Sequence, residues 1–587
     1  MKLWFLLLIS LLVFAPIYTV QADSLGQVAN FSIAPEYDTK SRSNMPMTLR
    51  HISDRTYWYI ADEYWNAISE GARIDLKNNI TELANEFDTK IYPTETAVFG
   101  SEPNPGIDGD PRITMALMPM QNSAGGYIDT GNNVFRKLLP RSNEREMVYL
   151  NINLINDSSR IKSYLAHEFQ HLITLYERDI VRDAPDDVWL NELRSEYAVD
   201  ILGYNYQPNS TNIQRRALTF LQNTKDSLTE WKNELIDYSS IALFANYVGS
   251  KFGRDVIGQT TRVKESGINA LTTVLKQKGF NINFDQLFVA WWSANILNDS
   301  KSKWYGYQND SLKNFAVKPE KIITINSYYP VDVTSLQLKD WQGGWYQINY
   351  PEKQNQITKI NFNSSSLESF GLGIIRINFD GTYDVSTTNL SKINSEINLD
   401  WNSGKIAKIL IMPFKHDRLA GFTDNETAVG LSFSISNIEK SDNIKLLQLN
   451  YLNLDGAIVS TSILGDIVLK DFGLTEGDFI KSVGSPDIFI INEYGHKRLV
   501  LNPAICLMYG HLGARGCFSA VKDVASNINN SFKLSWHVTN GETRDNIVYQ
   551  LIQIDDDRAY LKKVTTSVDP KTVFKINTKE FKSYELR

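Results

Sequence analysis

The alternation of apolar and polar residues divides this chain of 587 residues into two regions of different texture. Up to about residue 325, apolar positions recur at helical spacing around two strand-like runs, at 113–117 and 147–154. Helices are predicted at 76–87, 239–251, 270–277 and 284–297, besides the two helices described below. Residues 23 to about 45 are polar and show no period, so irregular chain is predicted there.

Beyond residue 325, short alternating strands separated by Gly, Asn, Ser and Thr turns replace the helical pattern. This texture predicts an all-β sandwich over 326–440 and a second β-rich module over 441–587. A hairpin pattern at 477–498 recurs weakly at 548–563, which suggests an internal repeat. Trp341 and Trp345 either pack in the sandwich core, which we favour, or line a carbohydrate or protein site. The predicted protein is multidomain: a mixed α/β (α+β) unit over 23–325, then C-terminal all-β domains.

The densest chemical signal is His167-Glu168-x-x-His171. Apolar residues at helical spacing, with Asp157 and Ser158 as possible N-caps, place this segment on a helix. Residues i and i+4 share a helix face, so the two imidazoles can bind one metal ion while Glu168 reaches a water beside it. The spacing is typical of zinc peptidases, although five residues of this kind also occur by chance in ordinary helices.

A second predicted helix, begun by Asp186 or Asp187 and running to about residue 204, carries three acids four residues apart. These acids are Glu192, Glu196 and Asp200. Like charges at this spacing repel mildly, and a bound cation would offset the repulsion. Glu192 is the expected third metal ligand, which leaves the open coordination position that a catalytic zinc site requires. Glu196 either orients a histidine or belongs to a solvated acidic face.

These segments resemble the gluzincin metallopeptidases, and more closely the hyicolysin family of secreted bacterial neutral metallopeptidases. The resemblance covers about residues 45–330, and its matching stretches are 86–88, 125–127, 143–150, 167–173 and 189–192. It implies one catalytic zinc ion held by His167, His171 and Glu192. Glu168 would take a proton from the attacking water and deliver it to the leaving amine. Leu193 departs from the glycine that many such sequences have after the third ligand.

The resemblance also implies a hydrogen-bond donor that stabilises the oxyanion, a histidine or a tyrosine. The chain has no histidine between His171 and His416, so Tyr238 is predicted as the donor, with Tyr204 and Tyr206 as rivals. A packed or surface tyrosine is the alternative at each of these positions, because the chain has 28 tyrosines.

By the same resemblance, an edge strand near residues 125–129 is expected to bind the substrate main chain by β-augmentation. The glycines there allow close backbone approach, and a plain hairpin is the alternative. Asp108-Gly109-Asp110 offers oxygen ligands for calcium, but an ordinary turn is the favoured interpretation.

Residues 1–22 are expected to form a signal peptide, because an apolar run from 3 to 14 is followed by a small-residue site at Ala22. An uncleaved anchor is the alternative. The expected location is secreted or extracellular, with retention at the cell surface through the C-terminal β domains as an option. In an exported chain, Cys506 and Cys517 are expected to form one disulfide or to remain two thiols.

Two function classes follow. The leading hypothesis is a secreted zinc metalloendopeptidase that hydrolyses proteins or peptides. The alternative is a surface adhesion or binding protein built on a peptidase-like domain with little or no activity. The presence of all three ligands and the base favours an enzyme. The net charge of −7 argues against nucleic-acid partners, and no segment after the first 22 residues is long and apolar enough to span a membrane.

Overall fold

The computed structural model describes residues 22–204, 210–325, 331–351, 355–390, 396–401, 405–441, 444–447 and shorter stretches from 452 to 587. The chain forms two compact units. The first contains residues up to 218 with 241–249 and 253–266, and the second contains 219–240, 250–252 and 267–587. The domain ranges drawn from the sequence remain predictions. The expected signal peptide lies outside the described residues except for Ala22. Among the described residues, no helix has the length and apolar character needed to cross a membrane.

The first unit is built on a six-stranded sheet with the order β1-β2-β3-β4-β6-β5. Its strands are β1 (Val28–Ser32), β2 (Asn44–Ile52), β3 (Thr56–Ala61), β4 (Ile113–Met118), β5 (Gly126–Tyr127) and β6 (Met147–Asn151). The central strands β3, β4 and β6 are parallel, and the outer pairs are antiparallel.

Two details of the predicted strands were wrong. Residues 23–45 are not irregular throughout, because β1 pairs with β2. Phe31 is the one buried side chain of β1, so its sequence carries almost no alternation. The run predicted at 147–154 ends as a strand at Asn151. Residues 152–154 form a 3₁₀ turn whose Asn153 amide donates to the Asn151 side chain.

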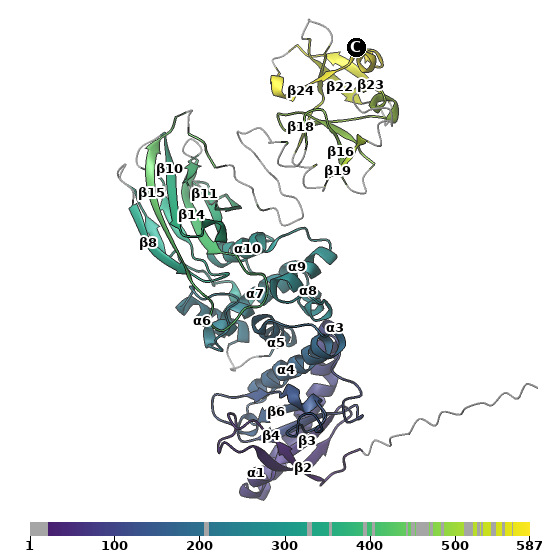
Figure 1. Ribbon diagram of the computed structural model, residues 1–587, viewed down its shortest axis with the longest axis vertical. Coiled ribbons are helices and arrows are strands. Elements are labelled where there is room, and N and C mark those ends of the chain that lie inside the picture. Colours follow the sequence, from purple (N-terminus) through teal and green to yellow (C-terminus); the bar gives the residue numbers. More distant parts are fainter. Residues whose placement is uncertain are drawn as a thin grey trace, which may run out of the picture. The chain divides into compact units, whose positions relative to one another are not determined.

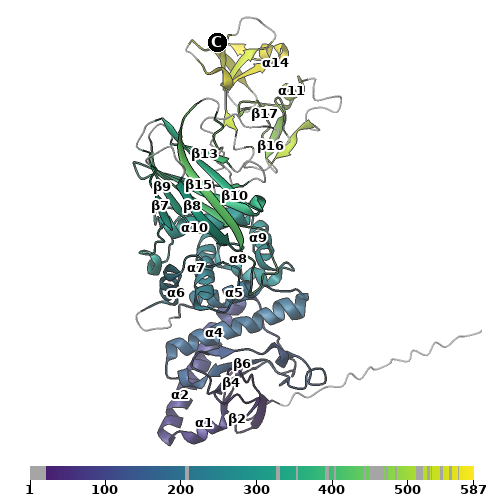
Figure 2. The same ribbon diagram turned by 60° about the vertical axis from the view of Figure 1, so that its left-hand side comes forward.

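Helices surround this sheet, and Figures 1 and 2 show α4 running along it beside β6. The helices that lie wholly in the first unit are α1 (Asp62–Ala67), α2 (Glu70–Glu86), α3 (Tyr92–Phe99), α4 (Ser158–Thr174), α5 (Val188–Leu202) and α8 (Arg254–Gln259). α6 (Asn212–Gln222) and α7 (Leu235–Phe252) each contribute residues to both units. α4 packs against β6 and α5, so the two helices predicted to hold the metal are neighbours.

One buried acid in α3 makes the stability of this unit depend on pH. Glu95 is fully buried, and neither of its carboxyl oxygens has a hydrogen-bond partner. Burial therefore raises its pKa well above the usual value of 4.5. The folded chain holds the proton that the unfolded chain releases. The stability that this proton contributes is complete below pH 4.5 and is lost as the pH rises through the folded-state pKa.

Glu95→Gln is expected to remove this loss, which has a limiting slope of about 1.4 kcal/mol per pH unit. Thermal and denaturant unfolding measured from pH 5 to pH 8 should show a variant whose advantage over the parent chain grows with pH. Glu70→Gln, at the start of α2 where Glu70 is exposed, is the matched control. An identical pH dependence of the parent chain and Glu95→Gln would contradict the account.

The second unit contains α9 (Gly267–Gln277), α10 (Phe284–Leu297) and two facing sheets. One sheet has the order β13-β10-β15-β8, with bounds Glu396–Asp400, Gln356–Ser364, Val429–Glu439 and Val331–Leu338. The other has the order β12-β11-β14-β9-β7, with bounds Tyr383–Asn389, Phe370–Asn378, Ile406–Lys415, Tyr346–Asn349 and Lys321–Ile323. All neighbouring pairs are antiparallel except β7 with β9.

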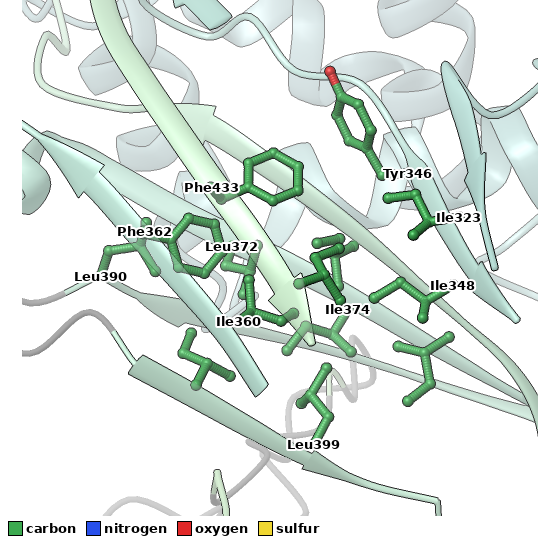
Figure 3. Close-up of a cluster of buried hydrophobic side chains, with 14 of the residues drawn as sticks. Ile323, Tyr346, Ile348, Ile360, Phe362, Leu372, Ile374, Leu390, Leu399 and Phe433 are labelled. Carbon is green, nitrogen blue, oxygen red and sulfur yellow. The ribbon is translucent and has the colours of Figure 1, made fainter. Parts of the chain in front are cut away.

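Side chains from both sheets meet in one core, as the predicted sandwich requires. Figure 3 shows Phe362 and Phe433 of one sheet with Leu372 and Ile374 of the other. Trp341 and Trp345 are 1% and 0% exposed, so the core interpretation of these two tryptophans is confirmed and the exposed-surface alternative is wrong.

The C-terminal part repeats one topology twice. The first sheet has the order β19-β16-β17-β18-β20, with bounds Lys522–Val524, Phe479–Ser482, Phe489–Ile491, His496–Leu499 and Lys533–Leu534. The second has the order β24-β21-β22-β23-β25, with bounds Val573–Ile576, His537–Asn540, Tyr549–Gln553, Ala559–Lys563 and Glu585–Leu586. In each sheet an antiparallel meander of three strands is flanked by two parallel partners. The predicted internal repeat is therefore confirmed.

The two repeats share one apolar core and a buried ion pair between Arg498 and Glu580, whose side chains are both 0% exposed. Tyr584 donates a further hydrogen bond of 2.9 Å to Glu580. Cys506 lies in this core. Cys506 is disulfide-bonded, so the alternative of a free thiol is wrong for this residue, and Cys517 lies outside the described residues.

Candidate metal centre

Local sequence explains why α4 is a stiff support for the histidines. The Asp157 carboxylate accepts a hydrogen bond of 3.1 Å from the amide of Arg160, which caps the helix as predicted. Apolar residues such as Ile161 and Leu165 are buried on the face that packs inward. His167 and Glu168 are also buried, at 8% and 7% exposure, so packing holds both side chains.

The three predicted ligand residues converge between α4 and α5. The Nε2 atoms of His167 and His171 are 3.2 Å apart. The Glu192 carboxylate lies 3.2 Å from Nε2 of His167 through Oε2 and 3.6 Å from Nε2 of His171 through Oε1. In the part of the chain that the structure describes, these residues form a group able to hold a metal ion.

The spacing of these atoms fits a tetrahedral ion. Zinc bonds to nitrogen and oxygen are about 2.0–2.1 Å long, so two ligand atoms on one tetrahedral zinc lie about 3.3–3.4 Å apart. The distance of 3.2 Å between the two Nε2 atoms and that of 3.2 Å between Nε2 of His167 and Oε2 of Glu192 are close to that value, while the distance of 3.6 Å to Nε2 of His171 involves the other carboxylate oxygen. Two imidazoles and one carboxylate are also donors that zinc accepts with one position left open. The residues present therefore fit a catalytic zinc ion.

The charges around the centre favour a cation. Burial alone would lower the pKa of His167, but the hydrogen bond and charge of Glu192, with the charges of Glu168 and Glu196, raise it to about 9. Burial lowers the pKa of His171, which keeps this imidazole neutral and able to act as a ligand. Burial also raises the pKa of Glu168 to about 7. A carboxyl group of this acidity both accepts and returns a proton near neutral pH.

Asn191 and Ser195 hold His171 in place from behind. The Asn191 Oδ1 atom is 3.1 Å from Nδ1 of His171, and the Ser195 hydroxyl oxygen is 3.2 Å from the same nitrogen. The Ser195 hydroxyl donates to Oε1 of Gln170 at 2.7 Å. A donor Nδ1–H toward Asn191 leaves Nε2 of His171 as the lone-pair nitrogen that faces the centre. Asn191 belongs to the matching stretch 189–192, but the sequence alone indicates no role for it.

Glu196 is neither a hydrogen-bond partner of a histidine nor part of a solvated acidic face, the two interpretations that were predicted. Its Oε1 atom is 3.8 Å from Nδ1 of His167, which is too long for a hydrogen bond but close enough for a strong charge interaction. It accepts two hydrogen bonds from Arg216, of 2.9 and 2.5 Å, and one of 3.1 Å from Asn212. The solvated-face interpretation is wrong for this residue, because Glu196 is 2% exposed. Arg216 carries no sequence signal that links it to the site.

The edge strand β5 passes directly beside Glu168. A Cβ atom built on Gly126 would lie 2.8 Å from Cγ of Glu168, and one on Gly125 would lie 2.2 Å from the ring of Tyr164. Side chains at these two positions would collide with their neighbours, so the glycines allow β5 to pass close to Glu168 and Tyr164, and the expected approach of a substrate main chain stays a prediction. β5 pairs with β6 on one side and is the last strand of the sheet. Its position at the sheet edge confirms that part of the prediction.

Tyr37 is a neighbour of the centre that sequence reasoning missed. Its ring stacks on Tyr127 of β5 with the centroids 4.5 Å apart, and its carbonyl accepts a hydrogen bond of 3.0 Å from Gln121. Burial and the negative charges of Glu168 and Glu192 raise the pKa of the Tyr37 hydroxyl. The hydroxyl therefore lies within the electrostatic field of the metal centre. One tyrosine in a polar segment gives no periodic signal by which it could have been found.

The predicted oxyanion donor Tyr238 lies in the second unit. Its hydroxyl donates to Oδ1 of Asn233 at 2.8 Å, and its ring packs edge-on against Trp231. Its role at the centre stays a prediction.

The rival donors are placed as follows. The Tyr204 hydroxyl donates to Oε1 of Glu86, the last residue of α2, at 2.7 Å. Tyr206 lies outside the described residues. His416 belongs to the second unit, where its Nδ1 atom is 3.0 Å from Oδ1 of Asp285.

The segment considered for calcium is a turn. The Asp108 carboxylate accepts from the amide of Asp110 at 2.9 Å, and Asp110 accepts from the amide of Arg112 at 2.9 Å and from the Tyr57 hydroxyl at 2.8 Å. Both carboxylates are thus used within the turn, and the turn interpretation is confirmed.

Comparison with known proteins does not assign the chain to a family. No protein-family model matches the chain, and no curated protein matches it. Among solved structures, a periplasmic inhibitor of g-type lysozyme from Aeromonas hydrophila is similar over 20% of this chain and 98% of its own, with 12% identity and a TM-score of 0.14. The pre-peptidase C-terminal domain of a collagenase from Bacillus anthracis is similar over 20% of this chain and 97% of its own, with 13% identity and a TM-score of 0.13. Scores at this level carry no argument about function.

Proposed function

We propose that this protein is a zinc-dependent peptidase of the gluzincin type. The observation that carries the proposal is the convergence of the ligand atoms of His167, His171 and Glu192, with the side chain of Glu168 next to them and beside an edge strand. Zinc is proposed over other divalent ions because two imidazoles and one carboxylate are a donor set that it takes in hydrolases.

Each part of the site has a separate task in this proposal. When bound, zinc would supply Lewis-acid polarisation of the scissile carbonyl and would lower the pKa of water. Glu168 removes a proton from the attacking water and passes it to the leaving amine, the task of a positioned carboxylate base. β5 offers its free edge to the substrate main chain. The expected substrate is an extended peptide or protein segment.

The experiment that tests the proposal is hydrolysis of casein and of a quenched-fluorescence peptide library by the purified full chain. Cleavage is expected, and a zinc chelator should abolish it until zinc is restored. Stoichiometric metal without cleavage of any substrate would contradict the enzyme and favour the adhesion or binding protein. Secretion, and retention at a cell surface through the β domains, remain part of the proposal.

Two tyrosines compete for the role of oxyanion donor. The resemblance favours Tyr238, and the stacking of Tyr37 on Tyr127 of the edge strand β5 makes Tyr37 its rival. Tyr37→Phe and Tyr238→Phe should separate them in the same peptide assay. Loss of the donor is expected to lower kcat by about 10²- to 10³-fold with little change in KM, because the bond forms only in the transition state. Unchanged kcat in both variants would exclude both residues.

A further inference from the structure

A cavity of about 470 Å³ opens in the second unit beside the start of α10. Its walls come from α9, residues 280–285, Trp341 and residues 416–419, which follow β14. Figures 1 and 2 show α9 and α10 next to the sandwich. The volume is that of a small-molecule site, and the peptidase proposal gives this cavity no task.

Internal hydrogen bonds fix the loop that forms one wall. The buried carboxylate of Asp340 accepts from the amides of Asp417 and Arg418, at 3.1 and 3.3 Å. The carbonyl of Leu419 accepts from the amide of Ile268 at the start of α9, at 2.9 Å. A wall that is already held needs little ordering when a ligand binds.

Two further contacts join the walls to one another. The Nδ1 atom of His416 lies 3.0 Å from Oδ1 of Asp285, which links the loop to α10. Trp341 has φ of 53°, a left-handed conformation that a bulky residue rarely adopts, and its indole N–H donates to the carbonyl of Arg418 at 2.7 Å. Strain of this kind persists only where the surroundings hold it, and it is frequent at ligand sites.

The lining combines aromatic rings with neutral polar groups. Phe280 supplies apolar ring surface, the buried rings of Phe284 and Trp341 pack behind it, and Asn281 and Thr273 supply amide and hydroxyl groups. Such a surface suits a ligand that has apolar ring faces edged by hydroxyl groups.

The charged groups of the lining have both signs. Lys276 would repel a cation, while Asp285 and Asp417 would repel an anion. Carboxylate and imidazole groups also accept or donate hydrogen bonds to hydroxyl groups. An uncharged ligand rich in hydroxyl groups avoids both repulsions and can use these bonds.

We propose that this cavity binds a neutral sugar unit, as a free mono- or disaccharide or as the end of a glycan. The inference rests on the second unit alone and does not depend on peptidase activity. It makes the second unit a carbohydrate-binding part of the protein. A site of this kind would bring a catalytic unit to glycosylated material.

The test is sugar binding by the full chain, measured by saturation-transfer NMR and by calorimetry with maltose, cellobiose and chitobiose as probes. Thr273→Trp places a large ring in the cavity from a half-exposed position of α9. Gln277→Trp adds the same ring at an exposed position of α9 that does not line the cavity, and circular dichroism checks the fold of both variants.

At least one of these sugars should bind the parent chain and Gln277→Trp equally, and bind Thr273→Trp about tenfold or more weakly. Absence of binding by all three sugars at millimolar concentration would overturn the proposal. Equal binding by both tryptophan variants would place the sugar elsewhere and would overturn it as well.

Discussion

Glu168→Gln is expected to lower kcat for peptide hydrolysis by about 10²- to 10⁴-fold, the usual contribution of a positioned general base. An amide of the same size cannot take the proton from water or return it to the leaving amine. The side chain keeps its place beneath β5, because its Cγ atom is what packs against Gly126. Metal content and KM should therefore change little, and the loss should appear in kcat.

Glu146→Gln is the matched control for this substitution. Burial raises the pKa of Glu146 to about 7, as it does for Glu168, but the Glu146 carboxylate accepts from the amide of Ile107, outside the metal centre. The same carboxyl-to-amide change at an equally buried site should leave kcat unaltered. A Glu168→Gln enzyme that retains the parent kcat would show that another group is the base.

Glu192→Gln is expected to weaken zinc binding by at least about 100-fold. Substitution of residues that only support the metal ligands already lowers metal affinity by up to about this factor. The substitution removes both a ligand charge and the partner that raises the pKa of His167. Peptidase activity should fall with the metal and return in part at high zinc concentration. Equilibrium dialysis against a competing chelator measures the change in affinity.

Asp200→Asn provides the comparison on the same helix. Asp200 lies two turns after Glu192 on α5 and accepts a hydrogen bond of 2.8 Å from the Asn246 side chain, so it is engaged away from the histidines. Its carboxyl-to-amide change should leave zinc affinity as it was. Equal losses in the two variants would mean that the general charge of α5, and not coordination by Glu192, holds the ion.

The parts of the site that could be predicted from the sequence are residues that lie within one or two turns of the same helix. The spacing of His167 and His171 predicts a shared face, and Asp157 predicts the helix start, because both depend only on local geometry. Glu192 could be predicted because three acids at i,i+4 spacing are unfavourable without a cation. These three ligands converge as expected.

The features that could not be predicted from the sequence depend on contacts between segments that are far apart in the chain. Arg216 binds Glu196 across 20 positions, and Tyr37 lies near Glu168 although 131 positions separate them. Neither residue has a period or motif that marks it. β1 was missed for a related reason: an edge strand with a single buried side chain carries little alternation, and its pairing with β2 decides its structure.

Zinc K-edge X-ray absorption of the purified full chain, with the metal content of the same sample, tests the central claim most directly. We predict about one zinc ion per chain, with two imidazoles and further oxygen ligands at about 2.0–2.1 Å, and loss of this signal in Glu192→Gln. A chain without stoichiometric metal, or a zinc ion whose shell lacks imidazole, would contradict the assignment of His167, His171 and Glu192.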